Sequence, residues 1–350
     1  MRRLHDFARD FWQGELQGHG AALLDTALGP AEAAFRLATR TRSAWHSRLR
    51  WDAPPIPVVS VGNLVVGGTG KTPVVRWLAE WFLERGLEVA IVQRGYGRDE
   101  ALLHRRWFGP EAVFADSDRR RAVDMAASRG RSVAILDDGF QQRWHAHALS
   151  VLLVAAEDPE RVRLLPRGPY REPLSAARRA THVLVTRRTA SGPRSDRWRE
   201  RIAGVAPATS PAVVRLRMRG WRDMAGRPAS SPTGDVLALC GVARPRAFAE
   251  GLARLIPGGE IELVAYTDHH EYTVEDVVEL MARRRGRTIV CTGKDAVKLS
   301  AFPALAPHCV VVDLRVEGGP PEPLRLALQE LLDRCAANPG ASPGSSGNAG

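Results

Sequence analysis

Cysteine is scarce in this sequence, and its few copies are scattered. They are Cys240, Cys291, Cys309 and Cys335, and no two of them form a C-x-x-C pair. This spacing indicates neither a zinc site nor a disulfide framework. Because three of the four lie in or beside apolar runs, we interpret them as buried thiols in a reducing compartment.

Long apolar runs and aromatic residues are also scarce. No stretch of 18 apolar residues occurs, and the N-terminus lacks the apolar core and cleavage site of a signal peptide, so neither a clear membrane span nor a leader is predicted. Aromatic residues make up only 6% of the chain, and no RNA- or DNA-reading motif accompanies its net charge of +11. That charge suits an anionic partner, either a phosphorylated substrate, an anionic lipid or a nucleic acid.

Apolar, β-branched runs recur along the chain, with helical patterns between many of them. This alternation predicts an α/β fold with a mostly parallel sheet covered by helices on both faces. The expected strands are 56–61, 88–92, 132–136, 150–155, 182–186, 235–240, 260–265, 287–292 and 309–314. One expected helix begins near Val74, directly after the first strand and its loop. The other expected helices are 119–129, 244–255, 273–285 and 322–334.

A glycine-rich loop follows the first expected strand directly. The stretch VGNLVVGGTGKTP (61–73) has the strand–loop–helix context of a phosphate-binding loop, although Val65 stands where the first glycine of G-x-x-x-x-G-K-[ST] would be. Its backbone N–H groups can surround phosphate oxygens, Lys71 can reach the β- and γ-phosphates, and the Thr72 hydroxyl can ligate Mg²⁺. The expected nucleotide-binding residues are Gly67, Gly68, Thr69, Gly70, Lys71 and Thr72.

A second strand ends in two acidic residues. Asp137 and Asp138 follow the apolar run 133–136, which is the arrangement of a Walker B strand. It places a carboxylate beside the phosphate loop, where Mg²⁺ requires one. A simple Asp-Asp-Gly turn is the alternative, and the context of a buried strand favours the metal site.

Three further stretches have more than one interpretation. A carboxylate of Asp99-Glu100 could accept a substrate proton or pair with Arg98. The stretch 268–270 (DHH) could form a proton-handling dyad, a metal site or a surface turn. The loop 165–172 (LPRGPYRE) could clamp an anion or be purely structural.

The sequence is divided by composition. Residues 187–234, rich in Pro, Gly, Ser and Arg, interrupt the alternation. We therefore predict an N-terminal helical segment at 1–50, a P-loop core at 51–210, a smaller second α/β domain at 211–334 and a disordered tail at 335–350. Aromatics and arginines in 1–50 suit either a helix in a membrane interface or a helix packed on the core, and this segment alone favours the packed helix.

Taken in order, these motifs resemble the tetraacyldisaccharide 4′-kinases, the lipid A 4′-kinases of Gram-negative bacteria. The matching stretches are 61–73, RGYGR (94–98), DE (99–100), DDGFQ (137–141), LLPRGPYRE (164–172), DHHEY (268–272) and TGKDAVK (292–298). The resemblance implies ATP- and Mg²⁺-dependent phosphorylation of the 4′-hydroxyl of an acylated disaccharide 1-phosphate. It also implies a peripheral enzyme on the cytoplasmic face of the inner membrane, with anionic lipid as a partner and no nucleic acid, and it strengthens the membrane interpretation of residues 1–50.

The resemblance also assigns roles to individual residues. Asp99 resembles the catalytic base, His269 the histidine that pairs with it, and Lys71 the residue that holds the phosphates. The implied metal ligands are Thr72, Asp137, Asp138 and Glu172. Contacts to phosphate or substrate are implied for Asn63, Glu100, Arg119, Gln141 and Arg171.

The sequence departs from the family pattern at a few positions. RGYG and the DE pair abut here, whereas family members commonly separate them by an insert. Gln93 stands where Ser is frequent, Gln142 where many members have His, and Gly293 where Glu is usual.

Since Asp99 and His269 fall in different predicted domains, we expect closure of the domains to bring them together. The main alternative function is a P-loop ATPase switch acting on a protein or nucleic acid.

Overall fold

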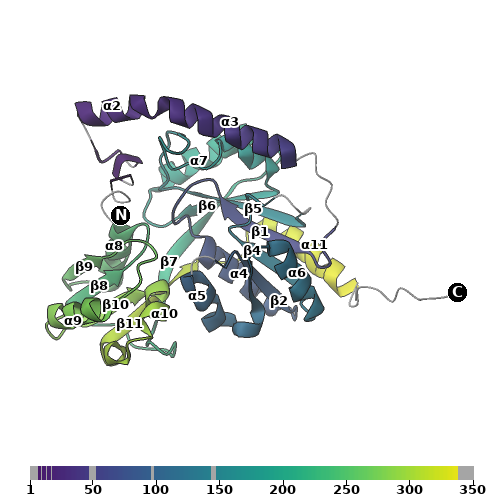
Figure 1. Cartoon of the computed structure of the whole chain (residues 1–350). Helices are drawn as coiled ribbons and strands as arrows, with labels where there is room; N and C mark the ends of the chain where they lie inside the picture. The colour runs from purple at the N-terminus through teal and green to yellow at the C-terminus, as the bar shows by residue number, and fades with distance from the viewer. Residues whose placement is uncertain are drawn as a thin grey trace.

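A computed structural model describes residues 7–46 apart from 9, 13 and 17, and then 53–95, 98–142 and 147–337. In this part of the chain the strands form one eleven-stranded sheet in the order β3-β2-β4-β1-β5-β6-β7-β11-β10-β8-β9 (Figure 1). All neighbouring pairs are parallel except β7 with β11. The strands are β1 (Val58–Asn63), β2 (Val89–Gln93), β3 (Val113–Ala115), β4 (Val133–Asp137), β5 (Leu149–Ala155), β6 (His182–Arg187), β7 (Ala212–Arg222), β8 (Val236–Cys240), β9 (Ile261–Ala265), β10 (Thr288–Thr292) and β11 (Cys309–Val316).

Helices cover the sheet where its strands carry apolar side chains on both faces. Strands β1, β2, β4 and β5 are buried at every position, which is typical of parallel strands packed between helices. The helices are α2 (His19–Ala27), α3 (Gly29–His46), α4 (Lys71–Leu83), α5 (Arg98–Phe108), α6 (Arg119–Ser128), α7 (Gly192–Val205), α8 (Pro245–Leu255), α9 (Val274–Arg283), α10 (Gly293–Leu299) and α11 (Glu322–Ala337). The predicted α/β fold is therefore confirmed, including its helical N-terminal segment.

Strand β7 joins the two halves of the sheet. Its first residues, from Ala212 to Arg215, run parallel to β6. From Leu216 to Arg222 it runs antiparallel to β11, with an irregularity between Val312 and Asp313. One long strand thus belongs to the half that carries the P-loop and to the half that carries β8–β11.

The nine predicted strands are all present, and the region 187–234 is the main correction. We expected an irregular transition there, but it contains α7 and β7. The residues after the expected last helix also differ, because α11 continues to Ala337 and residues 335–337 are therefore helical. The rest of the predicted tail, 338–350, lies outside the described residues.

The C-terminal helix packs on the P-loop half of the molecule. Leu324, Leu328 and Leu331 of α11 join the apolar cluster that contains Val59 of β1 and Val74 of α4. Sequence order had assigned residues 322–334 to the second domain, but their packing places them on the first (Figure 1). The chain therefore crosses between the halves more than once.

Helix α3 lies over α7 at the edge of the P-loop half, and α2 precedes it along the same side (Figure 1). Arg167 of the loop 164–171 donates to both oxygens of Asp25, at 2.9 Å each, and Arg163 contacts the same carboxylate at 3.0 Å. Glu32 is buried and accepts a hydrogen bond from the backbone N–H of Leu164 at 2.9 Å. Ion pairs therefore tie the N-terminal helices to the loop that follows β5.

The outer surface of these helices carries exposed apolar side chains. Leu23, Leu37 and Trp45 are all exposed by more than half. Among the described residues, no helix combines the length and apolar character that a bilayer span requires.

Candidate active site

The P-loop lies between β1 and α4, as the sequence predicted. Gly70 ends it in a left-handed conformation (φ 96°), and a Cβ at this position would lie 2.4 Å from Cδ1 of Leu216 on β7. Only glycine fits both constraints. Helix α4 starts at Lys71, so its N-terminal N–H groups point into the loop, where an anion is favoured.

Asn63 braces the P-loop from the end of β1. Its side-chain amide donates to Thr69 Oγ1 at 2.9 Å, and its Oδ1 accepts from Lys71 Nζ at 3.4 Å and from Arg171. The side chain of Gln141 donates to the Asn63 carbonyl at 2.8 Å. The structure therefore brings Asn63, Gln141 and Arg171 together beside the P-loop.

The Walker B carboxylates lie beside Lys71. Asp138 has φ 58° and lies 3.5 Å from Lys71 Nζ. Arg171 donates to both of its oxygens at 3.0 Å, and Arg119 donates to its backbone carbonyl at 2.8 Å. Burial alone would raise the pKa of Asp138, but the charges of Lys71 and Arg171 outweigh it and lower the pKa below its usual range. Asp138 is therefore an anion held in a cluster of cations.

Oxygen donors suited to Mg²⁺ converge at this point. Asp137 ends β4 and Thr72 lies in the first turn of α4; both are buried and line the same cleft as Asp138. A hydroxyl and two carboxylates are hard oxygen ligands of the kind Mg²⁺ prefers, so the donor set fits the cation. Glu172 stands apart from them, because its carboxylate pairs with Arg179 at 2.8 Å and it is not among the residues that line the cleft.

Asp99 and His269 form a pair across the two halves of the molecule. Nδ1 of His269 lies 2.9 and 3.0 Å from the two oxygens of Asp99, and Lys298 Nζ lies 3.8 Å from one of them. The predicted dyad is therefore already assembled here, whereas we expected it to require closure. The His269 side chain is 49% exposed, and Asp99 behind it is only 2% exposed.

The surroundings of the pair favour the ionised forms of both Asp99 and His269. Burial opposes ionisation of Asp99, but the hydrogen bond from His269 and the charge of Lys294 keep its pKa below the usual range. The hydrogen bond to Asp99 in turn raises the pKa of His269. Proximity to a carboxylate therefore favours imidazolium at this position.

Glu100 lies beside the pair and forms an ion pair with Lys294 of α10. Burial raises the pKa of Glu100. Asp99, Glu100 and His269 are close enough to ligate a common cation. Since Lys294 and Lys298 already supply positive charge to these carboxylates, the arrangement favours proton handling over a metal site.

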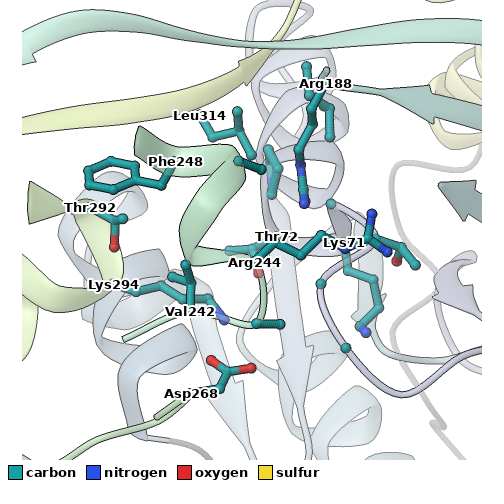
Figure 2. A pocket seen from close by; sticks show the side chains of 18 of the residues that line it. Lys71, Thr72, Arg188, Val242, Arg244, Phe248, Asp268, Thr292, Lys294 and Leu314 are labelled. Carbon is teal, nitrogen blue, oxygen red and sulfur yellow. The ribbon is translucent and has the colours of Figure 1, made fainter. Parts of the chain in front are cut away.

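Both clusters open into one cleft of about 1290 Å³ between the two halves of the sheet. Lys71, Thr72 and Arg188 reach it from the P-loop half, while Asp268, Thr292 and Lys294 reach it from the other half (Figure 2). Phosphate-binding groups and His269, the exposed member of the Asp99 pair, thus line one cleft.

A match to a family model decides which family this geometry represents. The model that describes the tetraacyldisaccharide-1-P 4′-kinases matches residues 24–105 and 98–333. The chain belongs to this family. The tetraacyldisaccharide 4′-kinase of Chlorobium phaeovibrioides is 33% identical over 323 residues, which cover 80% of this chain and 90% of that protein. That of Anaeromyxobacter sp. (strain K) is 35% identical over 329 residues, 84% of this chain and 86% of its own. The chain is accordingly a kinase that transfers phosphate to a hydroxyl group.

A solved structure agrees with this family's fold. LpxK from Aquifex aeolicus, crystallised in complex with ATP, matches with a TM-score of 0.66 over 89% of this chain and 99% of that protein. The two sequences are 24% identical, so this likeness supports the fold and nothing finer.

Sequence reasoning missed several residues of the kinase cleft. Arg244 of the second half reaches across to Asp158, which follows β5, at 2.5 Å. Arg188 follows β6, and its Nη2 lies 3.6 Å from where a Cβ on Gly70 would be. Burial lowers the pKa of Arg188 to about 10. The signal was present, because charged residues directly after parallel strands gather at the edge of the sheet that binds ligands.

Proposed function

We propose that this kinase transfers the γ-phosphoryl group of ATP, with Mg²⁺, to the 4′-hydroxyl of a tetraacylated glucosamine disaccharide 1-phosphate in lipid A biosynthesis. The observation that carries the proposal is the shared cleft, which the P-loop lysine and His269 of the Asp99 pair both line. The relatives' names specify the tetraacyldisaccharide and its 4′ position, and the Aquifex aeolicus neighbour was solved with ATP.

The P-loop half would hold the nucleotide. Backbone N–H groups of the loop and the N-terminus of α4 would bind phosphate oxygens, and Lys71 would move from Asp138 to the transferred group. Thr72, Asp137 and Asp138 are the residues that would hold Mg²⁺. When bound, the cation neutralises charge on the β- and γ-phosphates. Arg171 and Arg119 keep positive charge next to that position.

The other end of the cleft would hold the acceptor. We assign proton acceptance to Asp99 and its orientation to His269. A carboxylate of low pKa is a weak base, which suits phosphoryl transfer because its transition state is loose and proton transfer is late. Since Asp99 lies behind the His269 ring, acceptor binding must expose one of its oxygens.

Location and lipid contact belong to the same proposal. The exposed apolar residues of α2 and α3 suit a helix pair that lies in a membrane interface, and the positive net charge suits anionic lipid. We therefore place the enzyme on the cytoplasmic face of the inner membrane as a peripheral protein, with no nucleic-acid partner.

The test is transfer of γ-labelled phosphate from ATP and Mg²⁺ to an acylated disaccharide 1-phosphate in detergent micelles, alongside a reaction without acceptor. We expect label in the lipid and little free phosphate when the lipid is omitted. Equal phosphate release with and without lipid would instead identify an ATPase switch.

A further inference from the structure

Helix α5 carries a buried histidine that the mechanism above does not use. His104 is 0% exposed and lies five residues after Asp99. Its Nε2 is 3.1 Å from Oδ2 of Asp137, the last residue of the Walker B strand. One helix therefore carries the candidate base and also contacts a carboxylate at the Mg²⁺ end of the cleft.

The chemistry of this contact fixes the form of the imidazole. A carboxylate oxygen can only accept, so the nitrogen that faces Asp137 must carry the proton. Nδ1 is buried without a hydrogen-bond partner among the described residues.

The ring itself is held by aromatic neighbours. The centroid of His104 lies 5.5 Å from that of Trp107 in an edge arrangement and 6.4 Å from that of Phe108 in a stacked one. The imidazole therefore has little freedom to turn away from Asp137.

The same oxygen of Asp137 has a second donor, and the other oxygen has none among the described residues. Gln93 Nε2 approaches Oδ2 at 3.4 Å, from the end of the adjacent strand β2. His104 and Gln93 thus both hold Oδ2, so Oδ1 remains available to the cleft that Asp137 and Gln93 line. This is the arrangement by which neighbouring groups orient a carboxylate that ligates a metal.

We propose that His104 is a positioning residue that orients Asp137 toward bound Mg²⁺. The inference rests on the proposed function, since it requires a cation at this position. The effect runs through Asp137 alone, so it should alter metal-dependent nucleotide binding and turnover while leaving the affinity for the lipid acceptor unchanged.

Two substitutions separate the hydrogen bond from the volume it fills. His104→Leu fills the space but has no donor, whereas His104→Gln retains an N–H donor at a similar reach. His182→Leu serves as the matched control, because His182 lies on β6 and contacts the Pro323 carbonyl at 3.2 Å, away from the cleft. If His104→Leu does not yield folded protein, His104→Asn provides a second test, because its shorter amide cannot reach Asp137.

The measurement is nucleotide binding by calorimetry, with Mg²⁺ and with EDTA, together with kcat and the KM for acceptor. We expect His104→Leu to weaken binding in Mg²⁺ about 10- to 100-fold, with binding in EDTA and the acceptor KM unchanged. His104→Gln should recover most of the loss, and His182→Leu should behave as the wild type.

Equal weakening with Mg²⁺ and EDTA would reduce His104 to a structural residue and overturn the proposal, as would a folded His104→Gln variant with the full loss. If the wild type binds nucleotide equally well with Mg²⁺ and with EDTA, both the proposed function and this inference are overturned. If nucleotide binding depends on Mg²⁺ in the wild type and to the same extent in His104→Leu, only this inference is overturned.

Discussion

Gly70 shows how a single residue sets the geometry of the P-loop. Its positive φ and the lack of space beside Leu216 act together, and Leu216 belongs to the part of β7 that pairs with β11. A side chain here would strain the backbone and also push against β7. The P-loop conformation is thus fixed from outside the loop as well as by its own glycines.

Gly70→Ala should abolish measurable nucleotide binding in calorimetry. The companion Leu216→Ala removes the steric contact but not the backbone strain, which costs about 1–2 kcal/mol for a non-glycine residue. The double variant should therefore recover binding only in part. Wild-type affinity in Gly70→Ala would show that the loop rearranges freely.

The pH dependence of turnover distinguishes whether Asp99 or His269 accepts the substrate proton. Because the pKa of Asp99 is lowered, Asp99 stays ionised, and kcat should remain level between about pH 8 and 6. The raised pKa of His269 would instead make kcat fall with decreasing pH if its neutral ring took the proton. A tenfold fall per pH unit in that range, removed by Asp99→Asn, would transfer the role to His269.

At the scale of elements, nine of the eleven strands were predictable, and β3 and β7 were not. The strands of the P-loop half read as continuous β-branched runs because helices cover both of their faces. Strand β7 instead alternates apolar residues with Arg215, Arg217 and Arg219, a period of two that was present in the sequence but hidden by flanking Pro and Ser. Composition alone made this segment resemble a linker.

The candidate site was predictable to the extent that its residues stand in local motifs. The P-loop and the Walker B pair follow from their strands, and only the family resemblance connected Asp99 with His269. The contact of His104 with Asp137 depends on how α5 packs against the sheet. A side chain between apolar neighbours on a helix gives no indication in sequence of which carboxylate it will meet.

Helices α2 and α3 yield a prediction at this scale. Replacing Leu37 and Trp45 with Ser should reduce partition into anionic vesicles, because both side chains are exposed and would contribute apolar area to the interface. Since neither residue lines the cleft, ATP affinity should not change. Partition measured by vesicle sedimentation that equals the wild type would favour a helix pair with no membrane role.

At the scale of the whole molecule, the halves are connected by charged pairs as well as by β7. Arg76 of α4 donates to Asp313 of β11 at 2.8 Å, Arg244 reaches Asp158, and His269 reaches Asp99. Ion pairs therefore connect the two halves on several sides of the cleft, and the stability of the connection depends on their charges.

The Asp99–His269 tie should make stability depend on pH. The pKa of His269 is higher in the folded protein than in the unfolded chain, where it is about 6.5. Its contribution to stability is therefore complete at pH values below about 6.5 and is lost as the pH rises through the folded-state pKa. A lowered pKa for Asp99 contributes above its unfolded value of about 3.9 and is lost on acidification. The pair thus contributes most between about pH 4 and 6.5.

Thermal unfolding of the wild type and of His269→Gln, followed from pH 5 to 9, checks this dependence. The difference in Tm should be largest near pH 5 to 6 and should shrink as the solution becomes alkaline. A difference that stays constant across the range would mean that the contact stabilises through packing and not through charge.

Strand β7 also determines how the protein comes apart. Cutting the chain near residue 211 would leave β6 as an open edge and would remove the parallel partner of residues 212–215 of β7, and unpaired strand edges are a common origin of aggregation. Helix α11 would meanwhile be removed from the apolar cluster it completes on the first half. We therefore expect neither half to be obtained as a folded protein by separate expression, and the intact chain to unfold in a single cooperative transition.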